Sequence, residues 1–182
     1  MAKGKKVALT ILGVLVEGAV VFPFTPFGDA TLDVLRTGIL EQDQSKDYSG
    51  TRIDNLRAMH TALMLYHDSE GQFPDARFWM DAIEKNLQTA DLKPGEGKKK
   101  LRNPELPDGE YGFGMNEAAS GKYVDDVPEA AKAVLVFDSK DTTRNAQGDP
   151  GSLAPEPSRP GGNLAITIEG TLLRDGKPDK TP

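Results

Sequence analysis

The first pattern along the chain is an apolar run near the N-terminus. From Val7 to Phe22 the sequence reads VALTILGVLVEGAVVF, in which Glu17 is the only charged residue. At about 1.5 Å per residue a helix of this run is roughly 24 Å long, slightly shorter than a hydrocarbon core of about 30 Å. Lys5 and Lys6 can reach the interface before the run, and several phenylalanines suit the interface after it. The pattern predicts a single transmembrane helix.

Two other interpretations of the run stay open. An uncleaved or late-cleaved secretory signal has similar basic and apolar regions, but a signal peptide ends in small residues, whereas this run continues as FPFTPFGDA. A helix in a soluble core is the second, although such a helix rarely follows three lysines. We expect the run to remain as an anchor. Lys3, Lys5 and Lys6 then place the N-terminal end in the cytoplasm and the rest of the chain outside it.

Three positions inside the predicted anchor are candidates for a helix interface. Gly13 and Gly18 leave room for the close approach of a neighbouring helix. Glu17 lies between them, and a carboxylate inside a membrane tends to face protein because it is costly unless it is protonated or paired. Two interpretations of Glu17 stay open: it lies close enough to an interface to reach water, or it meets a donor on a neighbouring transmembrane subunit.

Helical periodicity dominates the first half of the body. After the prolines that end the anchor, a short helix is predicted within residues 29–40, followed by a polar linker up to residue 50. The clearest helix runs from Thr51 to Ser69, because apolar residues recur there at spacings of three and four and Gly71 follows. Its apolar positions are Ile53, Leu56, Met59, Leu63 and Tyr66. A second amphipathic helix is predicted over residues 78–87. Its apolar stripe consists of Phe78, Trp79, Ala82, Ile83 and Leu87.

The second half of the body alternates like strands. Strands are predicted at residues 111–114, 133–137 and 164–168, and Gly170 turns the last of them into a hairpin with residues 171–174. The segment 93–107 is predicted to be an exposed loop. The long loop 138–162 is either functional or mobile if it has no structure of its own. This order of elements predicts an α+β fold, in which a long helix packs on a small antiparallel sheet.

Composition and charge narrow the classes of function. Three of the 22 Lys and Arg residues precede the anchor, so the rest of the chain carries 19 basic residues against 28 acidic ones. A net acidic body argues against a nucleic-acid partner, which needs a basic face to neutralise phosphates. The chain has no cysteine, which excludes a disulfide framework, a thiolate metal site and a cysteine nucleophile.

Candidate chemistry is sparse. His60 and His67 lie seven residues apart on the predicted helix, but metal ligands on a helix are more often four apart and no third ligand is evident, so we expect a structural role. Asp138, Asp141 and Asp149 are weak candidates for oxygen ligands, because their spacing does not match the EF-hand pattern. No Ser-His-Asp order, phosphate-binding glycine loop or pair of catalytic carboxylates is apparent. We therefore expect a protein that is not an enzyme, with no cofactor, no bound metal and no small-molecule substrate.

Four local motifs follow one another in the body. They are NLRAM at residues 55–59, ALMLYHD at 62–68, GQFP at 71–74 and NLAITIEG at 163–170. Together with the N-terminal apolar helix they resemble bacterial prepilin-like (pseudopilin-type) proteins, and the resemblance runs from about residue 55 to residue 174. It implies a pseudopilin-like domain over residues 51–174, preceded by the anchor region 1–28 and the short helix and linker 29–50, and followed by a polar tail, 175–182. Related pseudopilins can hold calcium in a C-terminal loop, which is where the three aspartates lie.

The chain departs from that family at the processing signature. The prepilin pattern Gly-Phe-Thr-Leu-Ile-Glu corresponds here to ALTILG at residues 8–13, with Ala8 in place of the leader glycine and Gly13 in place of the assembly glutamate. The resemblance therefore suggests a pseudopilin-type protein that serves another assembly than a pilus.

We expect a non-catalytic structural or accessory subunit of a large bacterial membrane complex, in the inner (cytoplasmic) membrane with a periplasmic domain. Its expected partners are other transmembrane subunits and lipid. One candidate assembly is a photosynthetic reaction centre with its light-harvesting antenna. The alternatives are a minor pseudopilin of a type II secretion or type IV pilus system, and a periplasmic enzyme or ligand-binding module.

Overall fold

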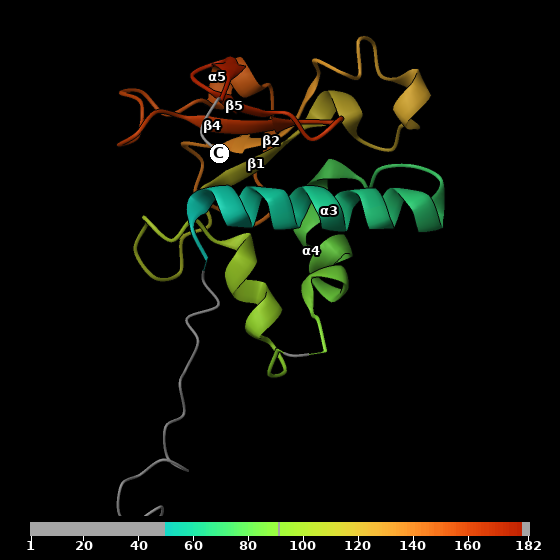
Figure 1. Ribbon diagram of the computed structural model, residues 1–182, viewed down its shortest axis with the longest axis horizontal. Helices are drawn as coiled ribbons and strands as arrows, with labels where there is room; N and C mark the ends of the chain where they lie inside the picture. Colours follow the sequence, from blue (N-terminus) through green and yellow to red (C-terminus); the bar gives the residue numbers. More distant parts are fainter. Residues whose placement is uncertain (1–49, 91, 180–182) are drawn as a thin grey trace, which may run out of the picture. The chain divides into compact units, whose positions relative to one another are not determined.

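The computed structural model describes residues 50–90 and 92–179. In these residues the chain forms a mixed α/β structure with helices and one sheet of six strands (Figure 1). The predicted anchor 7–22, with Gly13, Glu17 and Gly18, lies outside the described residues, as does the short helix predicted within 29–40. Among the described residues no helix combines the length and the apolar character that crossing a membrane requires.

The longest described helix, α3, spans Arg52–Glu70 and confirms the helix predicted from Thr51 to Ser69. Thr51 and Asp54 form a capping box, in which each side chain accepts a hydrogen bond from the backbone N–H of the other residue. Gly71 ends the helix in a left-handed conformation with φ 79°, and its N–H donates to the carbonyl of His67. Both ends of α3 are therefore determined by local sequence.

The sheet has the strand order β3-β1-β2-β4-β5-β6. Its strands are β1 Phe113–Asn116, β2 Val134–Asp138, β3 Gln147–Gly148, β4 Leu164–Thr167, β5 Leu172–Arg174 and β6 Lys177–Pro178. The pairs are antiparallel except for β1 with β3, which is parallel. The predicted hairpin around Gly170 is confirmed, because β4 and β5 pair antiparallel on either side of it.

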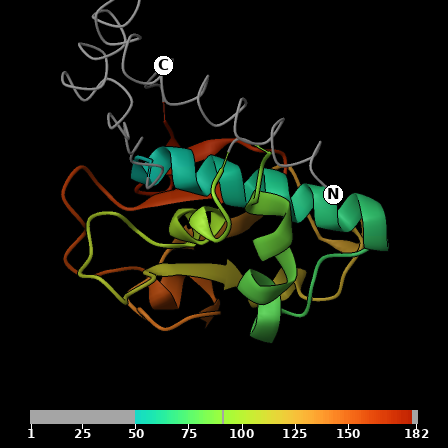
Figure 2. The same cartoon turned by 90° about the horizontal axis from the view of Figure 1, so that it is seen from below.

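Helix α3 lies between the sheet and a group of short helices (Figure 1). On one side it contacts β2 and β4, and on the other it contacts α4 (Trp79–Ile83), the 3₁₀ helix η3 (Glu84–Leu87) and the 3₁₀ helix η4 (Glu96–Leu101). Figure 2 shows the short helices beside α3 in the perpendicular view. The buried positions of α3 recur at spacings of three and four, so they form one stripe that faces the core; they are Arg52, Asn55, Leu56, Met59, Ala62 and Leu63. The fully buried large side chains of the core are Leu56, Met59, Leu63, Phe73, Trp79, Met80, Ile83, Leu101, Phe113, Met115, Leu135 and Ile166.

Two predictions about the segment after α3 were wrong in detail. The predicted helix 78–87 is interrupted: the 3₁₀ helix η2, Ala76–Phe78, leads into α4 and then η3. Trp79, Ile83 and Leu87 are buried as predicted, but Phe78 is 59 % exposed, because it lies at the end of η2 and not on the inner face of α4. The segment 93–107 is not simply an exposed loop. It contains η4, whose Leu101 is fully buried and which packs on α3.

The second half of the domain contains more secondary structure than its sequence indicates. Strand β1 begins two residues later than predicted. The long loop 138–162 contains β3 and the short helix α5, Pro150–Leu153. Strand β6 lies in the segment predicted as a polar tail, and it pairs with β5. These short elements are recognisable only through their pairing partners, since two or four residues carry no periodicity.

Candidate functional site

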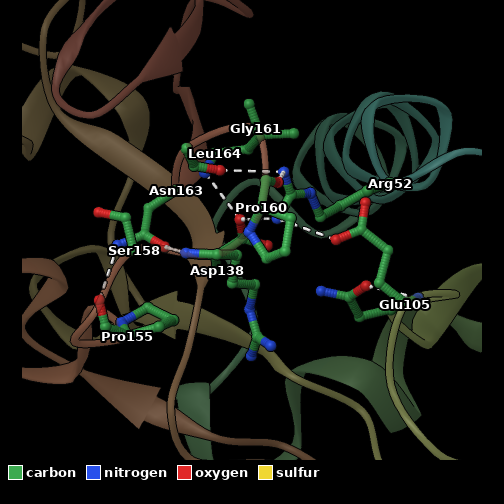
Figure 3. A network of polar contacts seen from close by, with 12 residues as sticks. Arg52, Glu105, Asp138, Pro155, Ser158, Pro160, Gly161, Asn163 and Leu164 are labelled. Carbon is green, nitrogen blue, oxygen red and sulfur yellow. Dashed lines mark hydrogen bonds and ion pairs between the residues drawn. The ribbon is translucent and has the colours of Figure 1, made fainter.

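Four ionisable side chains meet where the start of α3 approaches the end of β2, and Figure 3 labels three of them, Arg52, Glu105 and Asp138. They are Arg52 from α3, Glu105 from the segment after η4, Asp138 from β2 and Arg159 from the segment before β4. We refer to these four residues as the Asp138 cluster. A charged side chain is rarely fully buried unless it is paired, so a cluster of this kind has a specific role in folding or function.

Arg52 joins the cluster to the backbone before β4. Its side chain is 5 % exposed, and its Nη2 donates to the carbonyls of Pro160 and Gly162 at 3.1 and 2.9 Å. Its Nη1 lies 3.2 Å from Asp138 Oδ2 and 3.3 Å from Glu105 Oε2. The planar guanidinium presents several donors in a fixed geometry, which is what a site with two carboxylates and two carbonyls requires. One residue thus holds three separate segments at the start of α3.

Asp138 is the most deeply buried acid of the cluster. It is 1 % exposed, and its Oδ2 accepts a hydrogen bond of 2.7 Å from the N–H of Leu164. Its Oδ1 has no hydrogen-bond partner among the described residues. Burial raises the pKa of Asp138 from its ordinary value of 3.8 to about 6; Glu105 adds to this, while the Leu164 N–H, Arg52 and Arg159 oppose it.

The segment before β4 is held by a chain of side-chain hydrogen bonds. Arg159 donates from Nη2 to the carbonyl of Ser139 at 2.8 Å, and its backbone N–H donates to Asn163 Oδ1 at 3.0 Å. Asn163 donates from Nδ2 to the carbonyl of Pro155 at 2.9 Å, and its N–H donates to Asp175 Oδ1 at 2.9 Å. A connection without regular structure is therefore fixed to both neighbouring strands.

The cluster lies beside a shallow hollow of about 230 Å³, which is smaller than the roughly 300–1,000 Å³ typical of small-molecule sites. The hollow is lined in part by Arg52, Glu105 and Arg174, and Arg174 pairs with Asp179 at 2.7 Å. Charges of opposite sign are paired around it, and Nη2 of Arg52 is directed to two carbonyls. The arrangement is suited to holding segments together.

The three candidate oxygen ligands do not come together. Asp138 is buried in its cluster, Asp141 accepts from the N–H and hydroxyl of Thr143, and Asp149 accepts from the N–H and hydroxyl of Ser152 at the start of α5. The hydrogen bonds from Ser152 hold the pKa of Asp149 below its ordinary value. Within the part of the chain that the structure describes, no three His, Cys, Asp or Glu side chains form a group that could hold a metal ion.

The two histidines each hold a neighbouring segment to α3. His60 donates from Nε2 to the carbonyl of Ile168 at 2.8 Å, at the end of the β4 segment. His67 accepts the N–H of Val124 at 3.3 Å, and its ring packs 5.0 Å from that of Phe73. Each contact joins α3 to a segment distant in the sequence.

A second ionic group fixes the segment after β2 to the short helices. Arg144 donates to Asp81 at 2.8 Å, to Glu84 at 2.7 Å and to the hydroxyl of Tyr111 at 3.0 Å. The ring of Tyr111 lies between two guanidinium groups, with Arg102 and Arg144 each 5.4 Å from its centroid. Arg144 thus binds two other parts of the chain, each more than thirty residues away in the sequence.

Sequence reasoning found Asp138 but missed Arg52, Glu105 and Arg159. One signal was available for Arg52. A basic residue in the first turn of a helix opposes the helix dipole, so its presence there indicates that the charge has another partner. Glu105 and Arg159 lie in irregular segments and carry no comparable signal. Comparison of the chain with protein-family models, curated proteins and solved structures gives no match.

Proposed function

We propose that this chain is a non-catalytic structural subunit of a large bacterial membrane protein complex, held by the predicted helix at residues 7–22, with its main domain in the periplasm. The observation that supports this best is the set of contacts that the Asp138 cluster makes. The charged side chains of the cluster pair with one another and with backbone carbonyls of distant segments. These contacts stabilise the fold of the domain.

The exposed surface offers side chains that suit contact with neighbouring subunits. Phe78 and Tyr123 are 59 % and 56 % exposed, and aromatic residues are enriched in protein–protein interfaces. Phe78 is the last residue of η2, and Tyr123 approaches Gly71 at the end of α3. A domain that is rigid inside and presents aromatic side chains outside fits a role in packing on other subunits.

The proposed partners are other transmembrane subunits and lipid, and one candidate assembly is a photosynthetic reaction centre with its light-harvesting antenna. That choice rests on the resemblance described above. Purification of the tagged full chain in mild detergent, followed by mass spectrometry of what accompanies it, tests the assignment. Recovery of pigment-binding subunits in fixed ratio supports it, and recovery of the chain alone contradicts a stable complex.

The yield of the complex and its activity per complex separate a structural role from a catalytic one. Gly13→Leu and Gly18→Leu together should lower the yield by blocking close helix approach. Phe78→Ser with Tyr123→Ser should lower it too, with the exposed Leu65→Ser as the matched control. His60→Gln with His67→Gln should leave activity per complex unchanged. Loss of turnover in normally assembled complexes of the histidine variant would show that the subunit is catalytic.

A minor pseudopilin is the second candidate function. The observation that favours it is the arrangement of α3 along a mostly antiparallel sheet, as the resemblance implies. The two roles differ in where the chain is found. A minor pseudopilin should be recovered with sheared filaments or with the secretion apparatus, whereas a subunit of another complex stays in the membrane fraction when that apparatus is deleted.

A further inference from the structure

The carboxyl group of Asp138 is buried, but only one of its two oxygens accepts a hydrogen bond from the described residues. One carboxyl oxygen receives the N–H of Leu164 and lies 3.2 Å from Arg52 Nη1, while the other has no partner among the described residues. Nε of Arg52 and Nε of Arg159 are also buried without a partner in the described part of the chain. An ionised carboxylate in such surroundings is costly, because it has lost water without gaining a full set of donors.

Arg52 offsets this cost only in part. Its guanidinium is shared among Asp138, Glu105 and two backbone carbonyls, and the two ion-pair distances of 3.2 and 3.3 Å are longer than those of a close charge-assisted hydrogen bond, about 2.7–2.9 Å. Adding a proton to Asp138 removes the buried negative charge, while Arg52 keeps Glu105 and both carbonyls as partners.

We propose that Asp138 is a proton-binding site, and that proton uptake there strengthens the packing of the start of α3 against the end of β2 and the segment before β4. The site is built from groups on five parts of the chain, so its protonation state acts on the whole junction. Such a site would operate whether or not the chain is a subunit of a larger complex.

Three charged groups act on Asp138, each from a different neighbouring segment. Arg52 comes from α3, Glu105 from the segment after η4, and Arg159 from the segment before β4. Asp175, in the turn between β5 and β6, lines a second hollow of about 290 Å³ together with Asp138, and it accepts a hydrogen bond from the N–H of Asn163. With Asp138 ionised, the Asp138 cluster has two positive and two negative charges; with Asp138 protonated, it carries one net positive charge.

The direction of the pH effect follows from the folded and unfolded pKa values. Asp138 titrates near 6 in the folded domain and near 3.9 in an unfolded chain, so the folded state binds the proton more tightly. The contribution of Asp138 to stability is complete below the unfolded value and is lost as the pH rises through about 6. The folding equilibrium constant should therefore fall about tenfold between about pH 5 and about pH 7.5 on account of this residue.

The full chain in detergent micelles allows a direct test. Trp79 is the one tryptophan of the sequence and is fully buried, so its fluorescence reports unfolding of the domain in urea. A reference protein with the native Asp138 and Asp125 is compared with Asp138→Asn, which has nearly the same shape and cannot ionise, and with Asp125→Asn, the same change at an exposed acid. All three carry His60→Gln and His67→Gln, because imidazoles change charge in the same pH range.

Two results decide the matter. Between about pH 5 and about pH 7.5, the factor by which the folding equilibrium constant falls should be about ten times smaller in Asp138→Asn than in the other two proteins. Parallel curves for all three would overturn the proposal.

If Asp138→Asn does not fold, infrared titration of the wild type replaces it. A buried carboxylic-acid band that appears as the pH falls through about 6, and at lower pH in Glu105→Gln, supports the site; no such band above about pH 5 overturns it.

Discussion

Arg52 and Asp138 are buried charges whose energies depend on each other. Arg52 is the cation nearest to a carboxylate that is 1 % exposed, and it also binds the carbonyls of Pro160 and Gly162. Removing one partner of a buried pair leaves the other uncompensated, which costs far more than the pair contributes relative to apolar residues. The consequence can be measured with single and double variants.

Arg52→Met should lower the free energy of unfolding at neutral pH by about 3–5 kcal/mol, because it removes the cation of a buried pair and the donor to two carbonyls. Adding Asp138→Asn to this variant should restore part of the loss, because the buried charge is then gone. Urea denaturation followed by Trp79 fluorescence measures both. Arg57→Met, at an exposed position of the same helix, is the control and should cost less than about 0.5 kcal/mol. A double variant no more stable than Arg52→Met would contradict the coupling.

Gly112 shows how closely the segments around the Asp138 cluster approach. Its φ is +71°, and a Cβ there would collide with Leu106 Cδ1 and lie 3.3 Å from Asn103 Cβ. Gly109 has a φ of +97°, but no described atom lies within 4 Å of such a Cβ. Gly112→Ala should therefore destabilise the domain by about 1–3 kcal/mol more than Gly109→Ala, because only the former adds a steric conflict to the backbone strain. Equal unfolding free energies for the two variants would show that Leu106 moves aside at no cost.

At the scale of elements, α3 organises the domain because it is covered on two sides. Its buried residues meet β2 and β4 on one side, and α4, η3 and η4 on the other. Hydrogen bonds add direction to this packing: His60 binds the carbonyl of Ile168, and Asn86 donates from Nδ2 to the carbonyl of Ala62 at 3.2 Å. Apolar burial supplies most of the stabilisation, at roughly 25 cal/mol per Å².

Leu63→Ala should cost about 2–5 kcal/mol of unfolding free energy, since Leu63 is fully buried in the hydrophobic core. Leu135→Ala, at a fully buried position of β2, should cost a similar amount. Leu65→Ala removes the same atoms from a position that is 51 % exposed, two residues further along α3. The same denaturation experiment should give a loss below about 1 kcal/mol for Leu65→Ala. A loss at Leu63 no larger than at Leu65 would remove Leu63 from the core.

At the scale of the whole molecule, the proposed role depends on which side of the membrane each end occupies. The basic residues before the apolar run predict a cytoplasmic N-terminus, and the proposed partners require the described domain on the opposite side. Because the sequence contains no cysteine, a single introduced thiol can report its own location without background.

Ala2→Cys and Lys99→Cys should label differently with a membrane-impermeant maleimide. Lys99 is exposed on η4, so its cysteine should react in intact spheroplasts, whereas the cysteine at residue 2 should react only after permeabilisation. Gel shift of the labelled protein measures both. The opposite pattern would place the domain in the cytoplasm and exclude the proposed periplasmic role.

The sequence by itself determined the elements whose signals are local. Helix α3 was predicted within one residue at each end, because its periodicity, the Thr51 cap and Gly71 all lie within the segment. Strands β2 and β4 were recognisable because short apolar runs bounded by turn residues favour buried strands. Asp138 at the end of β2 was also noticed, but only as a weak candidate for an oxygen ligand, and its own segment does not indicate which residues surround it.

Only the tertiary structure decided what these elements do together. Arg52 meets carbonyls 108 and 110 residues away, and Asp138 binds an N–H 26 residues away. Leu101 is buried because η4 packs on α3, and β3 and β6 exist because β1 and β5 pair with them. Pairing and burial of this kind depend on where distant segments meet in space, whereas sequence patterns record only what neighbouring residues share.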